Sequence, residues 1–181
     1  MADALPDAIA LLKADHRTVE DLFEKFAAAK ASAAKLQLVK QICAELTVHA
    51  MIEEEIFYPA CKGKVKEDKL EEGLVEHDGA KVLMAELEAG SPDQEFYAAK
   101  VKVLSEQIEH HVGEEERPAD GIFSQARAAG LDMKDLGDRL RARKQELMAQ
   151  YKSEGLNPPE TRTFTGHDLE QGQPVGEPTK A

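Results

Sequence analysis

Tryptophan is missing from this 181-residue chain, aromatic residues make up 5% of it, and the only cysteines are Cys43 and Cys61. Two thiols this far apart do not form a thiolate zinc or iron–sulfur motif. We expect both to be reduced and without a role. One alternative stays open for Cys61, because the nearby Lys62 and Lys64 favour a thiolate and hence redox chemistry.

Long hydrophobic runs are also missing. No stretch approaches the roughly 18–20 consecutive apolar residues of a membrane-spanning helix, and residues 1–12 lack the pattern of a signal peptide. Basic residues are scarce: 23 against 35 acidic ones give a net charge of -12, which repels phosphate backbones and anionic membranes. We therefore expect a cytoplasmic protein with neither nucleic acid nor a membrane as its partner.

Helix-forming residues dominate what is present. Hydrophobic residues make up 42% and charged residues 32% of the chain, a balance that favours water-soluble helices over sheets. Apolar residues recur at steps of three and four, as on one helix face, at about residues 6–30, 33–60, 67–89 and 92–118. Ser91 and Pro92 fit the cap and first turn of the last segment. Short connections make these helices antiparallel neighbours.

The expected fold class is therefore all-α, with an up-down-up-down four-helix bundle in residues 1–130. A further amphipathic segment at about 133–152 predicts an additional C-terminal helix, in residues 131–154, that packs on the bundle. From Gly155 onward, proline, glycine and polar residues indicate an extended or disordered tail over residues 155–181.

Six polar side chains interrupt the apolar stripes. Two pairs have a spacing of four, which places both members on one helix face, and two single histidines lie on the other helices. A buried carboxylate needs a cation or hydrogen-bond donors beside it, and a metal ion meets that need. The predicted metal ligands are His16, His49, Glu53, His77, His111 and Glu115.

The fourth helix offers a second register, because His110 and Glu114 have the same spacing as His111 and Glu115. We prefer the latter pair, since only it continues the apolar stripe that ends at Ile108. Helix lengths pair His16 with His49 and His77 with His111.

Helix lengths do not place the two histidines of the second pair at the same level. Counted from Ser91, His77 and His111 differ by about 9 Å along the helices at 1.5 Å per residue. Either the turn after Pro92 is separate from the fourth helix, or the connection between the third and fourth helices is asymmetric.

Imidazole and carboxylate ligands suit iron, with zinc and manganese as alternatives. Six ligands are too many for one tetrahedral zinc ion. Two metals bridged by both carboxylates, with two imidazoles each, use all six and leave room for a bridging oxygen and an exogenous ligand. The remaining acidic residues of these segments, Glu54, Glu55, Glu114 and Glu116, fit a solvated face, and we assign no role to His167.

Four stretches carry a family resemblance: DHRTVEDLF at residues 15–23, HAMIEEEIFYPA at 49–60, EHDGAKVL at 76–83 and HHVGEEE at 110–116. Over about residues 8–128 the chain resembles the hemerythrin-like, or HHE cation-binding, family. The resemblance implies two oxo- or hydroxo-bridged iron ions, with Glu53 and Glu115 as bridging carboxylates and the four histidines as terminal ligands.

One position departs from the oxygen-carrying hemerythrins, which have a fifth histidine where this chain has Lys81. The departure implies an open or water-filled site on the iron that His77 binds, and it argues against reversible oxygen carriage. The six-ligand set is similar to that of bacterial di-iron stress-response and iron–sulfur repair proteins. We expect a non-haem di-iron protein that binds, senses or detoxifies oxygen, nitric oxide or peroxide. The alternatives are an iron donor, a repair-type redox protein, or a helical interaction protein without metal.

Overall fold

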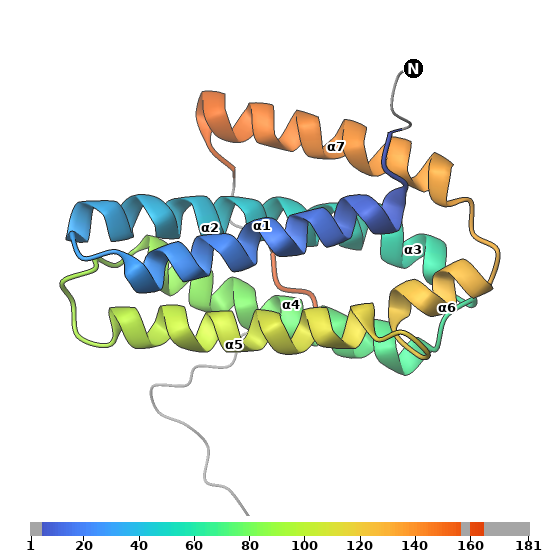
Figure 1. Cartoon of the computed structure of the whole chain (residues 1–181), viewed down its shortest axis with the longest axis horizontal. Helices are drawn as coiled ribbons and strands as arrows, with labels where there is room; N and C mark the ends of the chain where they lie inside the picture. Colours follow the sequence, from blue (N-terminus) through green and yellow to red (C-terminus); the bar gives the residue numbers. More distant parts are fainter. Residues whose placement is uncertain (1–4, 157–159, 165–181) are drawn as a thin grey trace, which may run out of the picture.

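The computed structural model describes residues 5–156 and 160–164, and all its regular elements in these ranges are helical. Four long helices alternate in direction (Figure 1): α1 (Ala8–Ala28), α2 (Ser32–Ile52), α4 (Glu67–Glu88) and α5 (Tyr97–Glu116). Helix α2 continues through a π-helical turn, η1 (Glu53–Phe57), into α3 (Tyr58–Cys61). The short α6 (Ile122–Ala128) and the long α7 (Met133–Glu154) follow the bundle. The predicted all-α, up-down-up-down bundle is confirmed.

The bundle interior has two apolar clusters, one toward each end. One contains Leu12, Ile52 and Phe123 and lies beside α6 and α7. The other contains Val19 and Leu104 and fills the end nearer the α1–α2 connection. Along α1 and α4, His16 and His77 fall between residues of the two clusters. The core is therefore built as an apolar layer, a layer of ionisable side chains and a second apolar layer.

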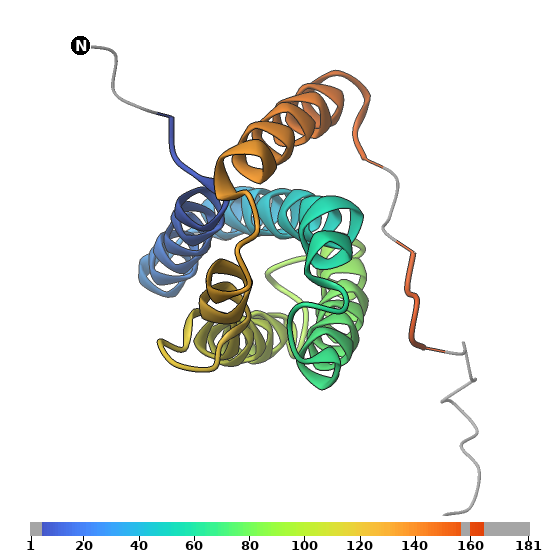
Figure 2. The ribbon, with the colours of Figure 1, turned by 90° about the vertical axis from the view of Figure 1, so that its right-hand side faces the viewer.

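Helix α7 lies outside the bundle, across α1 and α2 (Figure 2). Asp132 caps it by accepting hydrogen bonds from the backbone of Lys134 and Asp135. Gly137 allows the close approach, because a Cβ there would lie 2.8 Å from the backbone nitrogen of Ala8. The additional C-terminal helix is thus confirmed.

The predicted helix start at Ser91 and Pro92 is wrong, and the alternative of a turn after Pro92 that is separate from the fourth helix is what the structure shows. Ser91 does not cap a helix; its N–H donates to Gln94 Oε1, and residues 91–96 form separate turns. Helix α5 begins at Tyr97, after Phe96 with a φ of 66°. His77 then lies about 11 residues from the end of α4 and His111 about 14 from the start of α5, a difference of about 4.5 Å at 1.5 Å per residue. This brings the two histidines to within one helical turn.

Two local features of the helices were not predicted, a π-helical turn and the short helix α6. Pro59 has no N–H, so the α-helical hydrogen bond to Glu55 O cannot form. The chain widens into η1, where Tyr58 N–H bonds Glu53 O, before α-helical bonding resumes in α3. The second is α6, which follows a break at Pro118 and Gly121 and buries Phe123 in the apolar cluster of Leu12 and Ile52. Within the described residues, no helix combines the length and hydropathy needed to cross a membrane.

Candidate metal centre

All six predicted ligands converge at the centre of the bundle. None is more than 6% exposed, and Glu53 and Glu115 are fully buried. Their potential ligand atoms form two groups, each within 4.8 Å: one of His16, His49, Glu53 and Glu115, the other of Glu53, His77 and His111. Glu53 belongs to both groups.

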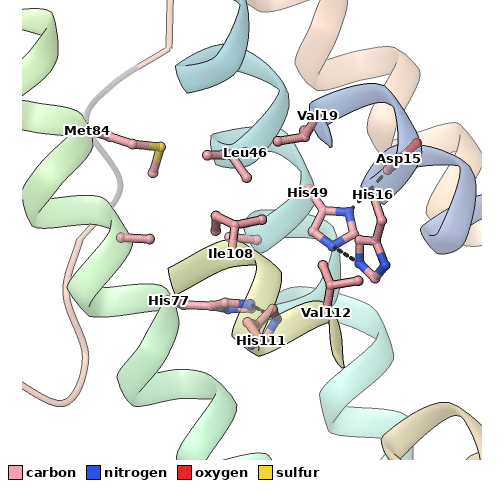
Figure 3. A pocket seen from close by; sticks show the side chains of 12 residues that line it. Asp15, His16, Val19, Leu46, His49, His77, Met84, Ile108, His111 and Val112 are labelled. Atoms are coloured by element: carbon pink, nitrogen blue, oxygen red, sulfur yellow. Dashed lines mark hydrogen bonds and ion pairs between the residues drawn. The ribbon is translucent and has the colours of Figure 1, made fainter. Parts of the chain in front are cut away.

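The histidines form two pairs (Figure 3). The Nε2 atoms of His16 and His49 lie 3.1 Å apart, as do those of His77 and His111. Glu53 Oε2 lies 3.3 Å from Nε2 of both His49 and His77, so this carboxylate stands between the pairs. Glu115 Oε2 lies 3.4 Å from His16 Nε2 and 3.7 Å from His111 Nε2. Both carboxylates can therefore span two cations.

Four buried carboxylate oxygens have no hydrogen-bond partner in the described structure: both oxygens of Glu53, Oε2 of Glu115 and, beside His49, Oδ2 of Asp15. An unsatisfied buried acceptor costs about 1–3 kcal/mol, and more when it is charged. The other Glu115 oxygen accepts a hydrogen bond from Tyr58, at 2.9 Å. The unpartnered oxygens face the imidazole nitrogens, so a divalent cation fits this set of donors.

Each imidazole also has a carboxylate at its outer nitrogen. His16 Nδ1–H donates to Glu116 at 2.8 Å and His111 Nδ1–H to Glu76 at 2.7 Å. His77 Nδ1–H donates to Glu54 at 3.1 Å, and His49 Nδ1 lies 3.5 Å from Asp15. At His16, His77 and His111 this hydrogen bond fixes the proton on Nδ1 and leaves the Nε2 lone pair free to face a metal ion. His49 Nδ1 makes an ionic contact with Asp15 and has no hydrogen-bond partner in the described structure.

These four carboxylates form a closed ring around the bundle. Each adjoins a predicted ligand in the sequence and serves the histidine of the next helix: α1 serves α2, the π-helical turn after α2 serves α4, α4 serves α5, and α5 serves α1. Glu54 and Glu116 were predicted to lie on a solvated face, and this was wrong. Glu54 is 7% exposed, and Glu116 binds His16. Asp15 and Glu76 were missed. The available signal was an acidic residue next to a ligand in all four motifs.

The buried carboxylates raise the proton affinity of the imidazoles. Burial would lower the pKa of His49, but Glu53 and Asp15 outweigh it and raise this pKa to about 10. Burial is likewise outweighed at His77, where Glu53 and Glu54 raise the pKa to about 9. Burial would raise the pKa of Glu53, yet His49 and His77 hold it well below its usual range. The layer thus favours positive charge, which protons supply in the absence of metal.

A cavity of about 30 Å³ adjoins the histidines. Its remaining wall is largely apolar and includes Val19, Leu46, Ala80, Met84, Ile108 and Val112 (Figure 3). The helix α4 contributes Ala80 and Met84 to this wall, whereas Lys81 forms ion pairs with Glu54 at 2.8 Å and Asp78 at 3.0 Å. The lysine that replaces the fifth histidine therefore does not line the cavity.

The register on α5 is resolved by burial. His111 is 3% exposed and its Nε2 meets His77, whereas the His110 side chain is 63% exposed and lies 3.4 Å from Glu76. The preferred pair is therefore the inward one. His167 lies outside the described residues.

Neither cysteine lies in a setting that favours a thiolate. Both are free and buried. Burial, with the charge of Glu88, raises the pKa of Cys43 to about 12, and burial with Glu115 and Glu53 raises that of Cys61 to about 12 against the smaller effect of Lys64. The redox alternative for Cys61 is therefore disfavoured.

Comparisons with known proteins agree with the geometry. The family model of the hemerythrin HHE cation binding domain matches residues 7–118. A DNA nickase from Nostoc sp. (strain PCC 7120) is 28% identical over 106 residues, which are 59% of this chain and 30% of that protein. The crystal structure of a hemerythrin HHE cation binding domain-containing protein from Mycobacterium kansasii matches with a TM-score of 0.69 at 20% identity, covering 83% of this chain and 95% of that one. The chain therefore belongs to the hemerythrin HHE cation-binding domain family and is a hemerythrin-like metal-binding protein.

Proposed function

We propose that the chain binds two iron ions through His16, His49, Glu53, His77, His111 and Glu115, and that this centre binds, senses or detoxifies oxygen, nitric oxide or peroxide. The observation that carries the proposal is the pair of unpartnered, fully buried oxygens of Glu53 between the two histidine pairs. Mixed imidazole and carboxylate donors suit iron. Ferrous ions would supply the electrons that reduction of such a small ligand requires.

The two proposed ion positions are unequal. The first group offers four side chains, and the second offers Glu53, His77 and His111. Tyr58 holds the Oε1 atom of Glu115, so this carboxylate has one oxygen to offer, whereas Glu53 has two. We infer that the ion beside His77 keeps the more open coordination, which is where an exogenous ligand binds.

The cavity supports a small and weakly polar ligand. Its volume of about 30 Å³ compares with roughly 10–15 Å³ needed for one water molecule. Its wall is apolar opposite the histidines, so it offers few hydrogen bonds to a larger polar substrate. A diatomic molecule or peroxide matches this space.

The other candidate functions have less support. A protein without metal would keep Glu53 and Glu115 buried with only protonated histidines to balance their charge, and three of their oxygens have no hydrogen-bond partner in the described structure. An iron donor must release its ions, and none of these ligands is more than 6% exposed. The relative from Nostoc is described as a DNA nickase, but this chain spans 30% of its length, and a net charge of -12 repels DNA. We therefore do not extend that activity to this chain.

Anaerobic titration with Fe(II) tests the proposal. We expect the wild type to bind about two equivalents of iron, one for each of the two proposed ion positions. In air it should develop near-ultraviolet ferric absorption. His111→Ala should lose iron, whereas His110→Ala, its exposed neighbour, should keep both ions. Wild-type protein that takes up no iron, or equal loss in the two variants, would refute the proposal.

A further inference from the structure

The chain continues past the family domain, and its continuation returns to the metal centre. The family model ends at residue 118. Helix α7 then crosses the bundle over α1 and α2, and residues 160–164 run along the outer side of α4 (Figures 1 and 2). Both parts place a cation on one of the carboxylates that hold an imidazole.

Helix α7 reaches His49 through Asp15. Lys144 Nζ donates to Asp15 Oδ1 at 2.6 Å, and the other oxygen of the same carboxylate lies 3.5 Å from His49 Nδ1, an ionic contact without a hydrogen bond. Asp15 is 7% exposed, so its charge needs a partner. Lys144 also lies 3.4 Å from Glu45 on α2, which holds the ammonium between α1 and α2.

The segment 160–164 reaches His77 through Glu54. Arg162 Nε lies 3.0 Å from Glu54 Oε2, and Glu54 Oε1 accepts the hydrogen bond from His77 Nδ1. The segment is anchored at Asp78, whose Oδ2 accepts hydrogen bonds from the backbone of Arg162 and Thr163 and from the Thr163 hydroxyl, at 2.6–2.8 Å. Asp78 is 1% exposed, so these bonds are shielded from water.

Lys81 completes this anchor from inside the bundle. Its ammonium contacts Glu54 and Asp78 and donates to the carbonyl of Glu160 at 3.2 Å. The lysine thus links the returning segment to two carboxylates. Glu54 adjoins Glu53 in the sequence and binds His77, and Asp78 adjoins His77 in the sequence.

The other two imidazoles are served from within the family domain. Glu116, which holds His16, is paired with Lys13 and Arg17 on α1. Glu76, which holds His111, lies beside His110 on α5. The continuation therefore acts on His49 and His77, one histidine from each pair.

We propose that the C-terminal continuation is part of the metal centre's outer shell, with Lys144 and Arg162 as positioning residues that orient His49 and His77 through Asp15 and Glu54. The proposal rests on the metal centre proposed above. Cations on the outer carboxylates fix their rotation, and the carboxylates fix the imidazole rings. Loss of a carboxylate that contacts a ligating imidazole lowers metal affinity about 10–100-fold, and Lys144 and Arg162 act one contact further out.

Five variants of the full chain test this: Lys144→Met and Arg162→Met, the conservative Lys144→Arg and Arg162→Lys, and Arg143→Met as the matched control. Arg143 neighbours Lys144 on α7 but pairs with the exposed Glu55, at 2.7 Å. The probe is Co(II), whose visible bands report coordination geometry. Its affinity is measured by chelator competition, and urea unfolding of each metal-free variant reports stability separately.

We expect both methionine variants to bind Co(II) more weakly, by about 10-fold at most, the lower end of the range for the carboxylates themselves, with altered visible bands. The conservative variants should recover most of the affinity. Arg143→Met should keep wild-type affinity and bands, even where it weakens the docking of α7. Affinity near wild type in the methionine variants, or an equal loss in Arg143→Met, would overturn the positioning role alone. A wild type that binds no Co(II) or Fe(II) would overturn the metal centre and this role together.

Discussion

At the scale of single residues, Tyr58 distinguishes the two buried glutamates. Its hydroxyl donates to Glu115 Oε1 at 2.9 Å, and its ring stacks on His77 with centroids 5.6 Å apart. Gly73 makes room for it, because a Cβ there would lie 2.6 Å from the hydroxyl oxygen. Tyr58 therefore fixes one oxygen of Glu115 and leaves the other facing the histidines.

Tyr58→Phe should destabilise the metal-free protein by about 1–3 kcal/mol, because a buried carboxylate oxygen loses its donor. The free energy of unfolding in urea measures this. Tyr151→Phe is the control, since that hydroxyl makes a long, exposed contact of 3.5 Å with Lys40 O, and its effect should stay within about 0.5 kcal/mol. Equal effects in the two variants would show that the Tyr58 hydroxyl has no special role.

The two thiols give a pH-dependent prediction. With a pKa raised to about 12, about one Cys43 in ten thousand is a thiolate near pH 8, and only the thiolate reacts. Iodoacetamide should therefore leave native protein unlabelled near pH 8 and label both cysteines in urea, as read by mass spectrometry. Since the folded pKa lies above the ordinary 9.0, the unfolded thiol ionises first, and stability should fall as pH rises from 9 toward 12. Rapid labelling of native protein would contradict the burial of the two thiols and their raised pKa.

The outer carboxylates show where sequence reasoning stopped at this scale. A residue next to an inward-facing one is rotated by about 100° around the helix, which periodicity alone assigns to solvent. In a bundle this direction points along the seam to the neighbouring helix. Glu54 and Glu116 therefore meet histidines of other helices, whereas the six inward residues lay on the apolar stripes and could be predicted.

At the scale of elements, the long helices could be predicted because their apolar periodicity extends over many turns. The failures occurred where local hydrogen bonding overrides this pattern. Ser91 and Pro92 have the composition of a helix start, yet Gln94 competes for the Ser91 N–H. The π-helical turn, in which Glu53 and Glu54 are both buried, departs from the 3.6-residue period that the sequence pattern assumes. Such turns are rare and occur often at functional sites.

Two glycine substitutions in the helices should change the stability of the protein in opposite directions. Gly137→Ala should destabilise the protein by about 1–3 kcal/mol, because its Cβ meets the backbone at the start of α1. Gly113→Ala should stabilise it by about 0.5–1 kcal/mol, because that glycine is inside α5 with open space around it. Thermal or urea unfolding measures both. A Gly137→Ala variant as stable as the wild type, or more stable, would show that α7 does not pack closely on α1.

At the scale of the whole molecule, the ionisable layer joins all four bundle helices between two apolar clusters. Each histidine is on a different helix, and the carboxylates link neighbours around the ring. A metal ion that binds these groups in the folded chain has no such site in the unfolded chain. Metal binding should therefore be linked to the stability of the entire bundle.

Loading with Co(II) should accordingly raise the unfolding temperature. At a free concentration about 100 times the dissociation constant, one site adds about 2.7 kcal/mol, which corresponds to about 5–10 °C for a chain of this size. Differential scanning calorimetry measures the shift, and EDTA should reverse it. Glu53→Gln keeps the side-chain volume but removes the carboxylate shared by both groups, so it should lose most of the gain, whereas Glu55→Gln on the exposed face should keep it. An equal shift in Glu53→Gln would mean that the ion stabilises the fold from somewhere other than the centre of the bundle.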